Sequence, residues 1–146
     1  MHTDFFNGIK PELLTVPANK TATVTSSECD LTGYDGASFL VLFGTSGDAL
    51  GAALYWSCKL QESDTSGSGF TDVAADGIVG STANAFGVVN AAADDDAVYG
   101  LGYKGKDKIV RVVVTATGVH AAGTIIGILA LKKPMTEPDG PTVLGS

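Results

Sequence analysis

The chain has few of the residues on which catalytic and metal chemistry usually depends. Its 146 residues include two cysteines, two histidines and one tryptophan. Cys29 and Cys58 stand alone, which excludes a disulfide scaffold and the closely spaced ligands of a zinc site, so we expect reduced thiols. His2 lies near the N-terminus and His120 in an expected turn between strands. Neither has a sequence partner that would make it a catalytic base, and both are expected at the surface.

Basic residues are also scarce. Nine Lys and Arg oppose sixteen Asp and Glu, giving a formal net charge of -7. A nucleic-acid partner is not expected, because a phosphate backbone requires clustered basic side chains. The densest basic group is Lys104, Lys106, Lys108 and Arg111. This group is interpreted either as a solvated strand edge or as a basic docking patch.

No apolar run approaches the length of a membrane span. The longest near the C-terminus, residues 123–131 (GTIIGILAL), is less than half of the roughly 20 residues that a spanning helix needs. The N-terminal segment MHTDFFNGIK lacks the apolar centre of a signal peptide. We therefore expect a protein made in the cytoplasm, with no membrane partner.

Two segments resemble ligand motifs only superficially. Asp94, Asp95 and Asp96 are consecutive, whereas a calcium loop spaces its carboxylates so that they converge on the ion. Residues 44–51 (GTSGDALG) lack the Lys-Ser/Thr pair of a phosphate loop. The sequence therefore predicts no active site, no metal and no cofactor, and we expect a protein that is not an enzyme.

Strand patterns fill most of the chain instead. We expect strands at 13–16, 21–25, 37–43, 54–61, 70–73, 78–80, 97–103, 108–117 and 123–131, because these segments are short, rich in β-branched and aromatic residues, and separated by Gly-rich turns. No segment of ten or more residues shows the apolar stripe of a helix. The sequence predicts an all-β fold, an antiparallel, jelly-roll-like β-sandwich of about eight strands.

Arms are expected at both ends of this sandwich. Residues 1–20 are interpreted as an N-terminal arm and the first strand, 21–131 as the sandwich domain, and 132–146 as an extended C-terminal arm. The C-terminal segment contains Pro134, Pro138 and Pro141, which exclude helix and remove ladder donors. Residues 81–96 are either a long connection across the sandwich or one weak strand.

Two strand patterns indicate what their faces contact. Residues 54, 56, 58 and 60 (Leu, Trp, Cys, Leu) alternate with polar residues, which predicts an inward-facing row with Trp56 in the core. Residues 37–43 (ASFLVLF) are apolar almost without interruption, which indicates a strand that is covered on both sides or lies at an oligomer contact. The two glycines of residues 97–103 suggest a bulge or close backbone approach.

The order of three segments carries a family resemblance. Residues 59–74 (KLQESDTSGSGFTDVA), residues 102–118 (GYKGKDKIVRVVVTATG) and a Gly/Ala-rich last strand ending at a proline together resemble head decoration (capsid cement) proteins of tailed bacteriophages. The likeness covers about 30–134. The resemblance implies a virion protein that is bound to the outer capsid surface and stabilises it without catalysis. Residues 81–93 form an insertion relative to that pattern.

The implied partners are the major capsid protein and other copies of this chain, as a homotrimer. The expected contacts with capsid or subunits lie in the two arms, at Phe5, Phe6, Lys132, Lys133 and Pro134. Two other classes are kept as alternatives. One is a tail or head-tail adaptor protein of such a phage, which ring assembly in solution would favour. The other is a carbohydrate-binding or adhesin-type sandwich, which needs exposed aromatic residues.

Overall fold

The computed structural model describes residues 8–135 as an all-β protein, which confirms the expected fold class. Eleven strands lie in this range where the sequence predicts about eight, since four have only two residues each. They are β1 (Lys10–Lys20), β2 (Val24–Thr25), β3 (Cys29–Asp30), β4 (Tyr34–Ser46), β5 (Tyr55–Ser63), β6 (Thr71–Asp72), β7 (Ile78–Val79), β8 (Phe86–Val89), β9 (Ala97–Tyr103), β10 (Ile109–Thr117) and β11 (Thr124–Pro134). A single 3-10 turn, η1 (Ala75–Gly77), precedes β7.

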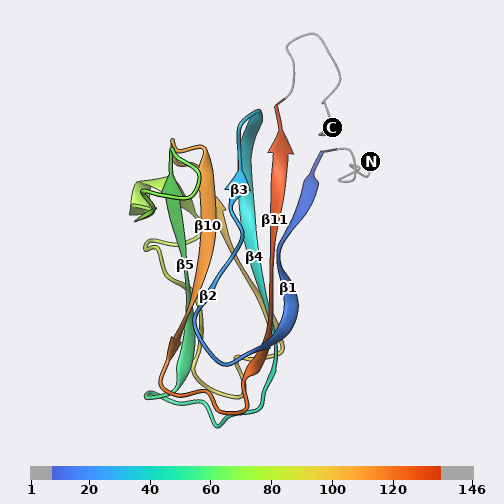
Figure 1. The fold of residues 1–146 in the computed structure, drawn as a ribbon, viewed down its shortest axis with the longest axis vertical. Coiled ribbons are helices and arrows are strands. Elements are labelled where there is room, and N and C mark those ends of the chain that lie inside the picture. Colours follow the sequence, from blue (N-terminus) through green and yellow to red (C-terminus); the bar gives the residue numbers. More distant parts are fainter. Residues whose placement is uncertain (1–7, 136–146) are drawn as a thin grey trace.

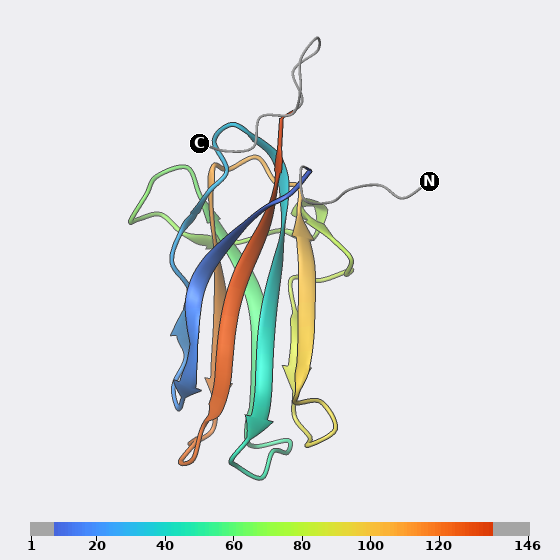
Figure 2. The ribbon, with the colours of Figure 1, turned by 90° about the vertical axis from the view of Figure 1, so that its right-hand side faces the viewer.

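The strands form two antiparallel sheets that pack face to face, as expected for a β-sandwich (Figure 1). Sheet A has the strand order β1-β11-β4-β9-β7. Sheet B has the order β2-β10-β5-β6, with β3 also paired to β10 and β8 to β5. Figure 2 looks onto the outer face of sheet A, where the first and last long strands, β1 and β11, lie side by side.

The core lies between the sheets and follows the predicted alternation. In β5, Trp56, Cys58 and Leu60 are fully buried, while the residues between them are half-exposed on the outer side of sheet B. Phe39 and Val41 of β4 are among the buried residues of sheet A. The inward register of β5 is therefore as the sequence predicts from residue 56 onward. Leu54 differs, because it precedes the strand, bridges to Gly51 and is only half-buried.

Strand β4 is the central strand of sheet A, and the side chains of its apolar run lie alternately on the inner and outer faces of the sheet. Phe39, Val41 and Phe43 point into the core. Leu40 and Leu42 alternate with them, and both are partly exposed on the outer side of the sheet. Among the described residues the strand is thus covered on one side only, and the expectation of cover on both sides is wrong within the chain.

The sandwich takes in more of both chain ends than the sequence predicts. Strand β1 begins at Lys10, and β11 continues through Pro134, so the expected arm boundary at residue 132 is wrong. Lys10 pairs with Lys132 in the ladder between these strands. Pro134 ends β11, where a missing ladder donor matters least. Phe5 and Phe6 lie outside the described residues.

The segment at 81–96 contains one weak strand, which decides between the two interpretations. Strand β8 pairs with β5 with an irregular register, and its Gly87 has φ 61°. A side chain at this glycine would meet the ring of Tyr99 at 2.9 Å, so close approach and backbone conformation both require glycine. The Asn84 side chain holds the preceding turn by bonding both the N–H and the carbonyl of Leu60, at 2.8 Å each.

Candidate functional site

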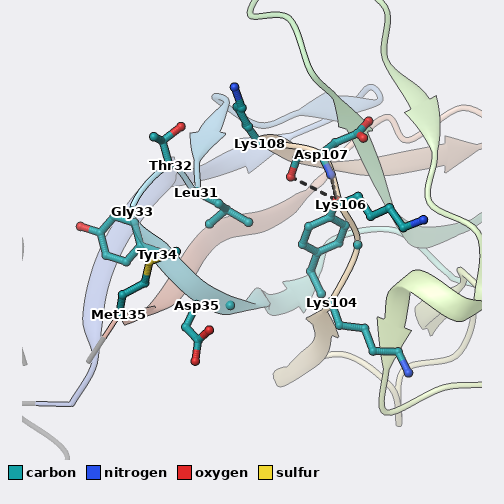
Figure 3. A pocket seen from close by; sticks show the side chains of 13 residues that line it. Leu31, Thr32, Gly33, Tyr34, Asp35, Lys104, Lys106, Asp107, Lys108 and Met135 are labelled. Atoms are coloured by element: carbon teal, nitrogen blue, oxygen red, sulfur yellow. Dashed lines mark hydrogen bonds between the residues drawn. The ribbon is translucent and has the colours of Figure 1, made fainter. Parts of the chain in front are cut away.

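A hollow lies at the end of the sandwich where β1 begins and β11 ends. This cavity of about 390 Å³ lies between the loop that precedes β4 and the loop that joins β9 to β10. Lys104, Lys106 and Lys108 line it, but Figure 3 shows their side chains pointing in different directions instead of converging on one point. The cavity therefore does not form a cradle for an anion. Arg111, counted with these lysines in the sequence, lies apart from them in β10.

Tyr103 has the most strongly shifted pKa of the residues that line this cavity. Its hydroxyl donates to the Glu62 carboxylate and accepts the backbone N–H of Asp107 at 3.1 Å. Burial, followed by the Glu62 hydrogen bond and charge, raises the pKa of Tyr103. A tyrosine held neutral in this way is a poor base or nucleophile, because only the phenolate would react. Its contacts instead fix the loop between β9 and β10.

The predicted contact residues at the end of β11 have different surroundings. The ammonium group of Lys132 lies 2.6 Å from a Glu12 carboxylate oxygen and 4.3 Å from the Tyr34 ring centroid. Since Lys132 is buried, its charge is engaged inside the chain and not available to a partner. Lys133 is exposed and lies 3.7 Å from Asp35, while Pro134 is buried. Of these three residues, Lys133 alone has an exposed side chain.

A buried polar cluster lies at the opposite end of the sandwich, and the sequence analysis missed it. His120, expected at the surface, is 2% exposed, so that expectation is wrong. Its ring stacks on Trp56 with 4.1 Å between centroids, and its Nε2 faces the Thr117 carbonyl at 3.1 Å. Nδ1 has no hydrogen-bond partner and lies 3.8 Å from Asp48. No sequence spacing reveals this cluster, because its members come from three segments that only the fold brings together.

The acidic residues at this end hold loops together. The Asp48 carboxylate accepts the backbone N–H groups of Ala122 and Gly123 at 2.9 and 2.8 Å. These two hydrogen bonds are the main reason that the pKa of Asp48 lies below its usual range. Asp95 likewise accepts the Ser46 N–H at 2.8 Å. The loop that follows β4 is thus attached through its own aspartate to the segment that precedes β11.

Asp94, Asp95 and Asp96 do not converge on a common point. Asp96 accepts the Thr45 hydroxyl, and Asp94 accepts the Asn90 N–H at 3.3 Å. Within residues 8–135 no group of three His, Cys, Asp or Glu residues is arranged to hold a metal ion. No helix in that same range has the length and apolar character to cross a membrane.

The outer face of sheet A is the most unusual surface of the described chain. Apolar side chains from all four long strands occupy it, including Leu13, Leu40, Leu42, Val98, Ile125 and Leu129. Leu40 lies over Gly100, where an added Cβ would come within 2.7 Å of it. The two glycines of β9 therefore permit close approach, as the sequence predicts, and keep the face flat. Charged side chains lie at one end of the face, where exposed Lys133 of β11 is 3.7 Å from exposed Asp35 of β4.

The outer face of sheet B is different in kind. Asp72 accepts hydrogen bonds from both Lys59 and Gln61, at 3.0 and 2.9 Å. Arg111 donates to Gln61 and lies over the Phe70 ring, 3.9 Å from its centroid. These polar side chains are paired with one another, as on a surface that remains in water. The sandwich is thus polar on one broad face and apolar on the other.

Comparison of the chain with protein-family models, curated proteins and solved structures finds no match. What the chain does must therefore be argued from its own geometry. Trp56 is in the core, as predicted, so it offers no exposed ring for stacking on a sugar.

Proposed function

We propose that this protein is a viral structural protein that binds the outer surface of an icosahedral phage capsid and stabilises the shell without catalysis. Its partners are the major capsid protein and further copies of the chain. Two of the three sequence segments that carry the family resemblance form neighbouring strands, which agrees with this proposal. Residues 59–74 span most of β5 and all of β6, residues 102–118 contain β10, and Gln61 pairs with Arg111 between them.

The observation that carries the proposal is that the start of β1 and the end of β11 lie at the same end of the sandwich. Lys10, which begins β1, pairs with Lys132, close to the end of β11 (Figures 1 and 2). Residues 1–7 and 136–146 therefore continue from neighbouring points. Two segments that start together can fasten one end of a rigid body to an assembly, and linking two attachments strengthens both. This arrangement suits a protein that stands on a shell.

We also propose that the sandwich is a jelly roll. The chain passes from β1 in sheet A to the short strands β2 and β3 in sheet B, and the long strands β4, β5, β9, β10 and β11 then alternate between the sheets. The first and last strands lie side by side, and both sheets are antiparallel throughout. These are features of the two interlocked Greek keys of a jelly roll, an architecture common in viral capsid proteins.

Stabilisation of the shell follows from mass action. A ligand that binds only the assembled shell shifts the equilibrium toward assembly, even where each contact is modest. A trimer would multiply the attachments that each unit makes. In this proposal the protein is found on the outside of the virion, after synthesis in the host cytoplasm.

The test is co-sedimentation of purified protein with shells that lack it, together with the temperature at which the particles release DNA. Variants lacking 1–7 or 136–146 should keep the β-sheet circular dichroism of the full chain and bind shells more weakly. Truncation must stop short of β1 and β11, because Glu12 and Lys132 form an ion pair inside the sandwich. A full chain that never sediments with shells, or that sediments with tails instead, contradicts the proposal.

A further inference from the structure

Sheet A leaves an apolar face uncovered that a protein of this charge would not be expected to leave in water. Leu13 is 58% exposed, Ile125 52% and Val98 58%, and partly exposed leucines lie between them. The rows are continuous across strands, since Leu129 pairs with both Leu13 and Leu40. Large contiguous apolar patches on a soluble protein mark interaction sites.

The edge of the same sheet adds a second, independent observation. Strand β1 pairs with β11 on one side. No described strand pairs with its other side, where the Leu14 carbonyl accepts the Ser27 N–H at 3.1 Å. Exposed edge strands are normally protected by charged side chains, yet residues 13–19 of β1 (LLTVPAN) carry none. Val16 there is 67% exposed. Two register shifts and Pro17 disturb the ladder, which favours side-chain packing over extension of the sheet.

The size of the face matches what a stable interface requires. Four strands at about 4.8 Å spacing and roughly eleven residues at about 3.3 Å each give a face of about 19 by 36 Å, or about 700 Å². The accessible surface of a ridged face exceeds its projected area. A standard interface buries about 800 Å² per partner, so the area of the face does not limit a contact, and the area buried depends on how much of the partner packs on it.

The chemistry of the face selects the occupant. The formal net charge of -7 opposes association of two copies. A contact between copies must therefore form through a surface that adds no charge repulsion of its own, and this face is such a surface. Interfaces between permanent copies of one chain are more apolar than those between separately folded partners. The face also offers few groups with which to recognise a polar partner. A second copy of this chain fits these properties best.

We propose that copies of this chain associate by packing the uncharged edge of β1 on one copy against the outer face of sheet A on the next. The edge and the face are different surfaces, so the contact is heterologous, and a heterologous contact closes into a ring when its rotation allows. The contact deepens the proposed function, since it supplies the interface of the proposed trimer and rests on that proposal for the number of copies.

The test compares two interface variants with a matched control. Leu42→Asp places a charge on the face, and Val16→Asp places one on the edge. Thr115→Asp places the same charge on the outer face of sheet B, at a half-buried position of β10. Sedimentation equilibrium should give an oligomer, expected as three times 14.8 kDa, for the wild type and for Thr115→Asp. Each interface variant should weaken association by at least about 30-fold, the loss typical of a central interface residue.

Mixing the two interface variants makes the test sharper. In a heterologous contact, the intact edge of Leu42→Asp can still pack on the intact face of Val16→Asp. The mixture should therefore form a two-chain species that neither variant forms alone. A mixture that stays monomeric contradicts the edge-on-face arrangement.

Hydroxyl-radical footprinting of the wild type gives a reading that depends on no substitution. Leu13, Val16 and Leu42 should become protected as concentration rises, whereas Val119, which is 86% exposed in the loop after β10, should not. A wild type that stays monomeric at several hundred micromolar, or unchanged oxidation of these residues in an oligomer, overturns the inference. Monomers that still sediment with shells would leave the proposed function standing, and oligomers that never bind shells would leave only the inference.

Discussion

Replacing Trp56 tests whether the inward register of β5 determines stability. The side chain is 0% exposed, and its indole N–H donates to the Thr124 hydroxyl at 3.1 Å. Its ring also covers His120, which lies 4.1 Å away between centroids. Trp56→Ala removes this burial, leaves a cavity between the sheets and takes a hydrogen-bond partner from Thr124.

Two substitutions at Trp56 separate the effect of its burial on stability from the effect of its hydrogen bond. Trp56→Ala should lower the free energy of unfolding by about 3–5 kcal/mol, the range for deleting a large buried ring. Trp56→Phe keeps most of the burial and loses the N–H donor, so we expect about 1–2 kcal/mol. The control is Tyr55→Ala on the outer side of β5, where the side chain is half-exposed. Its backbone carbonyl, which faces His120, is unchanged, and the loss should be about 1 kcal/mol.

Urea unfolding followed by far-UV circular dichroism measures all four proteins by one signal. Trp56 is the single tryptophan, so the wild type should also show blue-shifted emission that moves to the red on unfolding. Equal losses for Trp56→Ala and Tyr55→Ala would refute the register. A Phe variant as unstable as the Ala variant would show that the hydrogen bond matters more than the cavity.

Three further predictions concern buried and titrating groups. Glu12→Gln should lower the free energy of unfolding in urea by about 2 kcal/mol, because it leaves the buried Lys132 ammonium without its carboxylate. Asp35→Asn, beside exposed Lys133, should lower it by less than about 0.5 kcal/mol. Equal losses for the two variants would contradict this. Burial raises the pKa of Cys29 and of Cys58 to about 12, so neither thiol of the native protein should react with iodoacetamide at neutral pH, and both should react in urea; rapid native labelling would contradict it. Hydrogen bonds from Ala122 and Gly123 lower the pKa of Asp48 in the folded state, so its contribution is present above the unfolded pKa of about 3.9 and is lost as pH falls below it. The stability of Asp48→Asn should therefore approach that of the wild type in acid, and a gap between them that does not narrow would count against this account.

The sequence predicts the parts of the fold that depend on local alternation. Trp56, Cys58 and Leu60 are inward because a strand has a period of two, and the pattern is visible without knowing any partner. The ends of β1 and β11 are different. They are strands because each supplies the other's hydrogen bonds across more than a hundred residues, and Lys132 looks like a solvated tail residue until Glu12 is placed beside it.

His120 shows the same limit at the other end of the molecule. A lone histidine in a Gly- and Ala-rich turn has the sequence context of a surface residue. Its burial comes from the Trp56 ring, which belongs to a strand more than sixty residues earlier in the chain. No local sequence pattern specifies that contact, so the burial of His120 cannot be predicted from the sequence.

The sequence predicts the apolar face of sheet A in part, and the reason bears on what the protein does. A run such as residues 37–43 predicts a strand that is covered on both sides or lies at an oligomer contact, and the described chain covers only one side, through Phe39 and Val41. Leu40 and Leu42 on the other side are neither replaced by polar residues nor hidden by another element of the described chain. Sheet B of the same chain carries paired polar side chains on its outer face. The difference between the two faces is the observation from which the contact between copies is proposed, and the oligomeric state is therefore the property to measure first.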